Sequence, residues 1–401
     1  MAHNPNLFEL IKMFKIRDPF AILKIILKAE PFILLKWCFI DLSYHKFVKI
    51  CNVLALIIHS VYFVFDVLYT IENFSLDFLL KYSSSMLIYI YVITNMVFAM
   101  VMEKYTLEMV NLSESEFWPM DFAGKRMEAE IGRNYLMTRI VYYFLGGALL
   151  ASMLILLPFF GDLNDWLLSS QMSVDYFGEW SVLVDLILFS TGPMVALSEI
   201  RAPAVFLYGI YKIDLQIFLL NKLIVQLSHE KARDDAKYQR RIFAKLRQFT
   251  KHHANLKKCM RGISDIMNLS MPVFVFIGAP GVISIMYYFL YSLDSASTIT
   301  KIRSVYVAVF TSVIVATFAH AGQKISDNTS LIFDTLTTCP WNLWDKRNRK
   351  VLLIFMANSV KPMTFSVAGI TVDYQFAIKM IKLSSSYALV LYQLKNQYNM
   401  N

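Results

Sequence analysis

Seven long apolar segments constrain the fold of this chain more than any other feature. Each has about the 20 residues that an α-helix needs to cross roughly 30 Å of hydrocarbon. Apolar residues make up 57% of the sequence, more than a soluble domain normally carries. We therefore predict an all-α, polytopic membrane protein with seven transmembrane helices. The segments are Phe47–Tyr69, Phe78–Met102, Met137–Phe160, Ser181–Tyr208, Ile266–Tyr291, Val305–His320 and Ile370–Leu394.

The charge of the loops predicts the orientation, because Lys and Arg near the ends of spans stay on the cytoplasmic side. The region before the first span and the loops 103–134, 221–261 and 324–361 are all basic. The loops 71–77 and 161–180 contain no Lys or Arg and carry acidic residues instead. The sequence therefore predicts a cytoplasmic N-terminus and an extracellular C-terminus. Only Lys81 at a span edge, and Lys301 and Arg303 in the third outer loop, depart from the pattern.

The chain shows no internal repeat or flexible linker, so we predict a single domain, 1–401. Residues 1–46 are expected to be a cytoplasmic N-terminal region, 47–322 to hold helices one to six, and 323–401 to hold the last helix. Within the first part, Phe20–Leu35 has apolar residues at helical spacing with lysines between them. This pattern fits a helix at the inner membrane surface or an ordinary amphipathic cytoplasmic helix.

The basic loop 221–261 also carries a helical apolar pattern. We interpret it as two arms that continue the membrane helices and pack together below the membrane. A solvated basic hairpin that binds anionic lipid headgroups is the alternative. The residues of the pattern are Ile217, Leu220, Ile224, Leu227, Ile242, Leu246, Phe249 and Leu256.

Several functions find no support in the sequence. The net charge of +9 follows from the positive-inside bias, so nucleic-acid binding is not expected. No Cys-x-x-Cys, phosphate-binding glycine loop or nucleophile elbow is present, and the histidines are scattered, so neither an enzyme nor a metal or cofactor site is expected. A transporter would carry paired broken helices. Pro272 and Pro280 interrupt the fifth span, but the first half of the chain shows no matching broken span.

The C-terminal part carries the most specific pattern. It begins with a Trp shortly before a charged cluster and a Leu-Leu run, in Trp341–Leu353, and continues with Lys361-Pro362 and Gly369. The final apolar helix is rich in Ser and Tyr, including Ser384 and Tyr387. In combination these elements resemble the C-terminal signature of the insect odorant receptors. The strongest match covers about the last fifth of the chain, and the rest agrees in length, topology and loop sizes.

The resemblance implies a ligand-gated, nonselective cation channel at the plasma membrane of olfactory neuron dendrites. In that family a tuning subunit forms a heterotetramer with a shared coreceptor, and no G protein is required. The coreceptor has an extended second cytoplasmic loop, whereas the loop here is short, which favours a tuning subunit. A self-sufficient channel resembling gustatory receptors and a multispan transporter remain the alternatives. The family's last helix is split, here into an anchor part at about Asp327–Ser359 and a pore part at about Ile370–Leu394.

The resemblance also implies a pocket for a small volatile ligand in the outer half of the membrane, among helices two, three, four and six. Tyr89 and Tyr306 are expected to offer hydroxyl groups to an ester or alcohol oxygen, and ordinary interhelical packing is the alternative for each residue. The candidates are Tyr82, Met86, Tyr89, Gly147, Ala151, Leu154, Phe189, Tyr306 and Phe310.

A gate is expected near the outer end of the last helix, by similarity to the ending of the coreceptor. Val390 and Leu394 are four residues apart and Gln393 is about one turn from Val390, so all three share one face of a helix. A ring of apolar side chains in a narrow pore stops ions by dewetting. Packing against lipid or neighbouring helices is the alternative.

Overall fold

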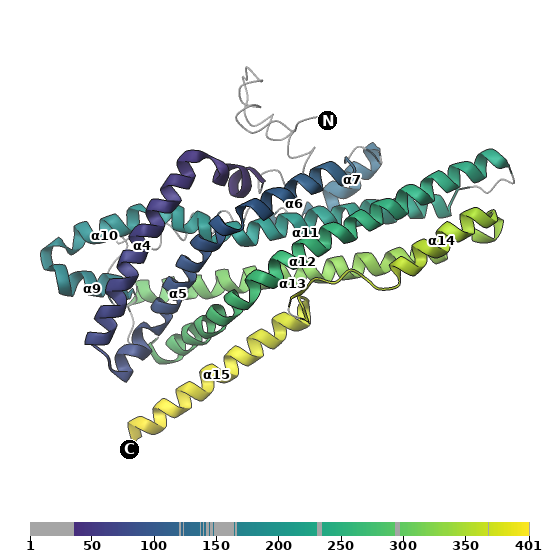
Figure 1. Ribbon diagram of the computed structural model, residues 1–401. Coiled ribbons are helices and arrows are strands. Elements are labelled where there is room, and N and C mark those ends of the chain that lie inside the picture. Colours follow the sequence, from purple (N-terminus) through teal and green to yellow (C-terminus); the bar gives the residue numbers. More distant parts are fainter. Residues whose placement is uncertain are drawn as a thin grey trace.

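The computed structural model describes residues 36–119, 167–230, 235–292, 297–367 and 369–400, together with 122, 124–136, 138, 140, 141, 144, 147 and 164. The chain forms an elongated bundle of helices, with α9 and α10 at one end and α14 at the other (Figure 1). The third predicted span, Met137–Phe160, lies almost entirely outside the described residues, and so does the predicted helix Phe20–Leu35.

The other six predicted spans correspond to helices. They are α4 (Lys46–Glu72), α5 (Leu76–Val101), α10 (Ser181–Ser190) with α11 (Gly192–Ser228), the second half of α12 (Ala236–Ser292), α13 (Thr298–Thr337) and α15 (Tyr374–Met400). Among the described residues, four runs of helix are long and apolar enough to cross a membrane, and α12 adds a fifth if its halves are counted as one span. Those halves meet at a 63° bend beside Pro272, which removes a backbone hydrogen bond from the helix.

Short elements connect these helices. They are η1 (Lys36–Asp41), η2 (Leu42–Tyr44), α6 (Glu103–Glu116), α7 (Lys125–Asn134), α9 (Leu168–Phe177), η5 (Gly178–Trp180), η6 (Trp341–Leu343), α14 (Lys346–Ser359), β1 (Ser366–Val367) and β2 (Ile370–Thr371). The two strands form an antiparallel hairpin in which Ser366 pairs with Thr371. Its turn contains Gly369 at φ +80°, a backbone conformation that favours glycine.

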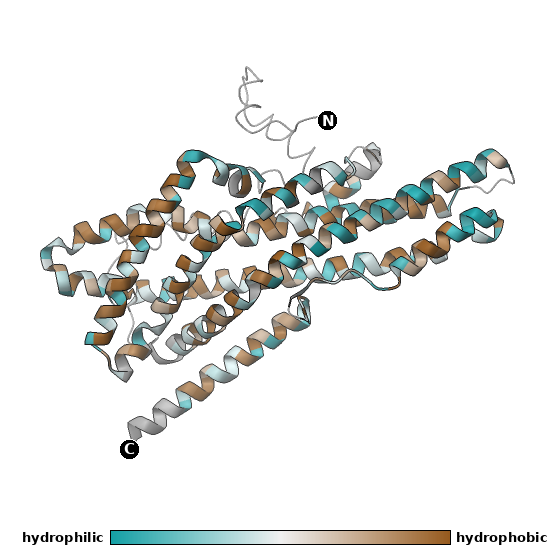
Figure 2. Cartoon of the chain, viewed as in Figure 1, coloured by the Kyte–Doolittle hydropathy of each residue, from teal (hydrophilic) through white to brown (hydrophobic). Residues whose placement is uncertain are grey.

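The main core of the bundle continues into the end that carries α14, and we call this end the anchor region. It is made by the distal parts of α11 and α13, the first half of α12, and α14. All eight apolar residues that the sequence marked in 217–256 are buried in this core. The prediction that the two arms pack together is therefore confirmed, and the solvated hairpin is wrong. Figure 2 shows hydrophilic residues along the outside of this region, whereas α4, α5 and α10 are mostly hydrophobic.

Two predicted boundaries at the end of the chain are corrected. The anchor helix is α14, which begins at Lys346 rather than Asp327, because 327–337 continues α13 with Ile332 and Leu336 facing the core. Pro340 then prevents a longer helix. The last helix begins at Tyr374 rather than Ile370, because Ile370 belongs to the hairpin.

Two buried histidines are expected to make the anchor region sensitive to acid. His252 and His253, outside the predicted spans, are each 3% exposed, and His252 stacks on Trp118 with ring centroids 3.6 Å apart. Burial lowers the pKa of both imidazoles to about 4. The folded chain therefore binds fewer protons than the unfolded chain, whose histidines titrate near 6.5, between about pH 6.5 and pH 4. We expect stability to be unaffected by these groups above pH 6.5 and to fall as the pH drops toward 4.

The measurement is the midpoint temperature of the detergent-solubilised protein between pH 7.5 and pH 5. The double variant His252→Phe with His253→Phe keeps aromatic rings in both places but has no proton to bind. Its midpoint should fall less over this range than that of the unchanged protein. Equal falls in the two proteins would contradict the prediction.

Candidate functional site

At the end of the bundle opposite the anchor region, α4, α5, α9 and α10 meet around a group of aromatic side chains (Figure 1). We call it the tyrosine cluster. Its buried members are Tyr62, Tyr69, Tyr82, Leu168, Met172 and Leu188, and Ile58, Phe78, Met86, Tyr89 and Val184 pack against them. Three predicted pocket residues on the second span, Tyr82, Met86 and Tyr89, are therefore brought together here. Their three- and four-residue spacing places them on one face of α5.

The sequence did not foresee the contribution of α9, because it lies in the predicted outer loop 161–180. Its buried face is unusual in carrying serines, Ser169, Ser170 and Ser173, beside Leu168 and Met172. A helical face made of serines leaves little apolar periodicity to recognise. These serines are buried because they bind polar groups of the bundle. Ser169 donates to Asp66 Oδ2 at 2.5 Å, and Ser173 donates to Asp185 Oδ1 at 2.7 Å.

Asp66 itself was missed, although the sequence carried a signal for it. It is a lone acidic residue inside the first predicted span, and charges at such a position are costly and normally functional. The structure buries it on α4 facing α9. Asp185, a second acid within a predicted span, lies on α10 and is half-buried.

A chain of hydrogen bonds determines that the hydroxyl proton of Tyr89 is donated to His59. His59 Nε2 lies 2.9 Å from Thr191 Oγ1, and His59 Nδ1 lies 2.8 Å from Tyr89 Oη. Thr191 donates its single hydroxyl proton to the carbonyl oxygen of Leu188 at 2.6 Å, so it accepts from His59 Nε2. The Nδ1 atom of a neutral imidazole with its proton on Nε2 is an acceptor, and Tyr89 must therefore donate to it. Tyr89 would have to break this bond to donate to a ligand.

The other tyrosine hydroxyls of the cluster also donate within the protein. Tyr62 donates to the carbonyl oxygen of Val184 at 2.6 Å, and Tyr82 donates to that of Asn164 at 2.9 Å. Tyr69 donates to Asp175. The site consequently offers aromatic surface and acceptor atoms.

The remaining predicted pocket residues lie apart or outside the described residues. Tyr306 and Phe310 stack on each other along α13 with centroids 6.1 Å apart, and Phe310 packs against the main core rather than the tyrosine cluster. Phe189 is partly buried on α10, and Gly147 is exposed. Ala151 and Leu154 lie outside the described residues.

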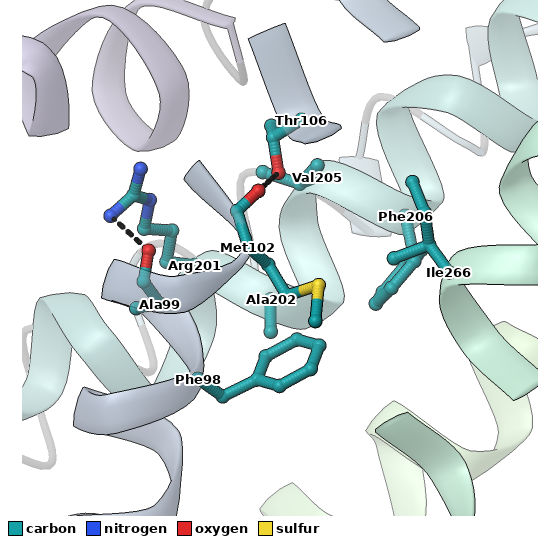
Figure 3. A pocket seen from close by; sticks show the side chains of 9 residues that line it. All are labelled: Phe98, Ala99, Met102, Thr106, Arg201, Ala202, Val205, Phe206 and Ile266. Atoms are coloured by element: carbon teal, nitrogen blue, oxygen red, sulfur yellow. Dashed lines mark hydrogen bonds between the residues drawn. The ribbon is translucent and has the colours of Figure 1, made fainter. Parts of the chain in front are cut away.

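A small cavity lies elsewhere, between α5, α11 and α12, and has a volume of about 20 Å³. Figure 3 shows its lining of Phe98, Ala99, Met102, Thr106, Arg201, Ala202, Val205, Phe206 and Ile266. Arg201 Nη1 donates to the carbonyl oxygen of Ala99 at 3.2 Å. This volume suits about one water molecule, so the cavity is too small for an organic ligand and is not the predicted pocket.

Of the predicted gate residues, Val390 and Gln393 are exposed on α15, and the side chain of Leu394 lies outside the described residues. Val390 is 50% exposed, and Leu389 and Leu391 beside it are exposed as well. Figure 1 shows the distal half of α15 diverging from the rest of the bundle. An exposed apolar helix of this kind requires lipid or other subunits around it.

Comparison with known proteins identifies relatives of the whole bundle. A family model described as 7tm Odorant receptor matches residues 75–385. The solved structure of the insect olfactory receptor OR5 from Machilis hrabei is similar with a TM-score of 0.64 at 13% sequence identity, over 94% of this chain and 100% of that one. The structure of the same receptor in complex with eugenol has a TM-score of 0.62 at 13% identity, with the same coverage. No protein with curated function matches. At this identity the two structures establish the shared fold.

Proposed function

The chain belongs to the 7tm odorant receptor family, and from that membership we propose that it is a tuning subunit which binds a small volatile odorant and opens a nonselective cation channel together with the coreceptor. The match to the family over 75–385 carries the proposal. It agrees with the resemblance of the C-terminal signature, and the family is one of receptors rather than enzymes. The fold of the insect olfactory receptors agrees with a multi-pass membrane protein.

We place the odorant in the outer half of the membrane, at or beside the tyrosine cluster. Such a site gains about 25 cal/mol for each Å² of apolar surface that it buries, and few directional contacts are needed to hold a small ligand. The N-terminus is proposed to be cytoplasmic and the C-terminus extracellular, in the plasma membrane of an olfactory neuron dendrite. Signalling then needs neither a G protein nor a cofactor.

The gate is proposed to be the ring of Val390 and Leu394 side chains contributed by α15 of each subunit. These apolar side chains keep a narrow pore dry when the channel is closed. A movement that replaces them with the polar Gln393 rehydrates the path. The exposure of Val390 and Gln393 on α15 supports this assignment.

The experiment is a recording of whole-cell current from cells that express the chain with and without the coreceptor, under a panel of volatile ligands. A cation current that requires both the coreceptor and an odorant supports the proposal. Current from the chain alone would instead indicate a self-sufficient, gustatory-like channel. Flux of the ligand without a conductance would indicate a transporter.

Replacement of Val390 by threonine tests the gate. Threonine has nearly the shape of valine, but its hydroxyl wets the ring, so we expect the current without odorant to rise several-fold. Leu389→Thr is the control, because the neighbouring residue is also exposed but points about 100° away around the helix. If both variants kept the resting current of the unchanged receptor, Val390 would not form the gate.

A further inference from the structure

One buried acceptor atom beside the tyrosine cluster has no hydrogen-bond partner among the residues that the structure describes. Asp66 is 3% exposed, and its Oδ2 atom accepts the hydroxyl proton of Ser169 at 2.5 Å. Its Oδ1 atom is buried and receives no hydrogen bond. A buried polar atom without a partner costs free energy, and an unpaired carboxylate costs considerably more. Within a membrane such a group marks a functional contact by default.

Apart from Ser169, whose hydroxyl is bound to Oδ2, the two phenols near Asp66 in the described part of the chain offer no donor to Oδ1. Asp66 lies near enough to Tyr62 and Tyr89 to interact electrostatically with both phenols, but their protons are donated to Val184 and His59. Any molecule that satisfies Oδ1 must therefore bring its own donor.

Within the described part of the chain, no cationic side chain forms an ion pair with Asp66. Asp185 on α10 is a second carboxylate, and it interacts electrostatically with the Tyr62 phenol as Asp66 does. Among the ion pairs of the described residues, none involves Asp66 or Asp185. The ammonium of Lys81 lies over the ring of Tyr82, 4.9 Å from its centroid. The cluster therefore combines two acidic groups with aromatic rings, the combination that attracts an organic cation.

We propose that the tyrosine cluster binds a small protonated amine, with the ammonium group bound to Asp66 Oδ1 and the apolar body among the aromatic side chains. This inference rests on the proposed odorant-binding function and names the chemical class of the ligand. The rings of the cluster stabilise the ammonium through cation–π attraction. Met86, whose Sδ lies 3.8 Å from Thr70 Oγ1, has an unbranched side chain that can rotate to make room.

The same contacts discriminate against other volatiles. Esters, ketones and aldehydes carry only acceptors, so they leave Asp66 Oδ1 unpaired and place a second oxygen near it. Site groups left unpaired by a ligand reduce its affinity strongly. An alcohol brings one donor but no charge, and a hydrocarbon brings neither.

The test compares amines with neutral molecules of the same shape on cells that express the chain with the coreceptor. The pairs are 2-phenylethylamine with propylbenzene, and 3-methylbutylamine with 2-methylpentane, and 2-phenylethyl acetate represents the esters. We expect each amine to activate at a concentration about tenfold or more below that of its neutral partner, because only the amine pairs with the carboxylate. Neutral odorants that activate the channel when amines do not would overturn the amine assignment and leave the odorant-gated function standing.

Asp66→Asn removes the charge and keeps the shape. It should raise the half-activating concentration of each amine about tenfold or more without a comparable change for the neutral partners. Asp66→Glu restores the charge and should recover the preference for amines. Asp265→Asn, at an exposed position of α12, is the control and should change nothing. If Asp66→Asn left the amine responses unchanged, the assignment of Asp66 would be wrong.

A binding measurement decides the inference even if no ligand opens the channel. 2-Phenylethylamine should raise the midpoint temperature of the purified receptor, and it should raise that of Asp66→Asn less. Stabilisation by the amine without any odorant-evoked current would support the site while contradicting the proposed channel. Absence of stabilisation together with absence of amine-evoked current would reject the site.

Discussion

Replacement of Asp214 by alanine is expected to destabilise the protein by about 3–5 kcal/mol, the cost of removing one partner of a buried ion pair. Asp214 is fully buried on α11. Its carboxylate accepts from Tyr135 Oη and Asn328 Nδ2, both at 2.6 Å, and lies 3.1 Å from the ammonium of Lys324. The variant leaves this partly buried lysine without its counter-charge and leaves two donors without an acceptor.

The network gives this residue a structural role at the base of the last helix. Lys324 lies one turn from His320 on α13, and His320 Nδ1 is 2.5 Å from Tyr374 Oη at the start of α15. The ion pair thus joins α11 to the part of α13 that contacts α15. Loss of the pair is expected to loosen this junction.

The measurement is the midpoint temperature of the detergent-solubilised receptor, and Asp334→Ala is the matched control on an exposed face of α13. The double variant Asp214→Ala with Lys324→Met should recover part of the loss, because a buried pair replaced on both sides leaves no unpaired charge. A midpoint for Asp214→Ala equal to that of the control would show that the network does not stabilise the fold.

Gly322→Ala is expected to displace the hairpin that precedes α15. A Cβ atom at this position of α13 would lie 1.9 Å from the carbonyl oxygen of Val372, far inside van der Waals contact. The backbone of Val372 has little freedom to move away, because its amide donates to the carbonyl oxygen of Phe365 at 2.8 Å. Overpacking of this kind costs about 1–3 kcal/mol and sometimes more.

The consequence should be visible in function as well as in stability. Because Val372 lies directly before α15, the shift moves the base of the proposed pore helix, and odorant-evoked current should be strongly reduced in channels that reach the surface. Gly262→Ala on α12 is the control, since a Cβ there meets nothing within 4 Å and alanine favours helix. If Gly322→Ala kept both the midpoint temperature and the current of this control, the close contact between Gly322 and Val372 would matter neither for stability nor for gating.

The sequence alone located most of the helices, because a span is recorded in a local window of about 20 apolar residues. The paired arms of the anchor region were predictable for the same reason: Leu246 and Phe249 repeat at helical spacing whatever they pack against. The C-terminal signature led to the correct family. The helix boundaries predicted within this signature were less accurate. Residues 327–337 are polar, so their composition does not show whether they continue α13 or begin a separate helix.

The candidate site depended on contacts that no local pattern records. Ser169 and Asp66 are 103 residues apart, and Tyr89 is connected to Thr191 only through His59. A serine or an aspartate has the same sequence signature whether it faces water or a buried partner. Sequence therefore named Tyr82 and Tyr89 without revealing that their hydroxyl protons are already donated within the protein.

The sequence by itself thus determined that the chain is a polytopic, all-α protein with its helices in this order, since hydrophobic length and period are local properties. Only the tertiary structure decided that α9 folds into the bundle, that Asp66 retains an unpaired oxygen among tyrosines, and that Gly322 leaves room for Val372. These features depend on how segments far apart in the sequence pack together. That packing sets which buried polar atoms gain hydrogen-bond partners and where two backbones have space to approach each other.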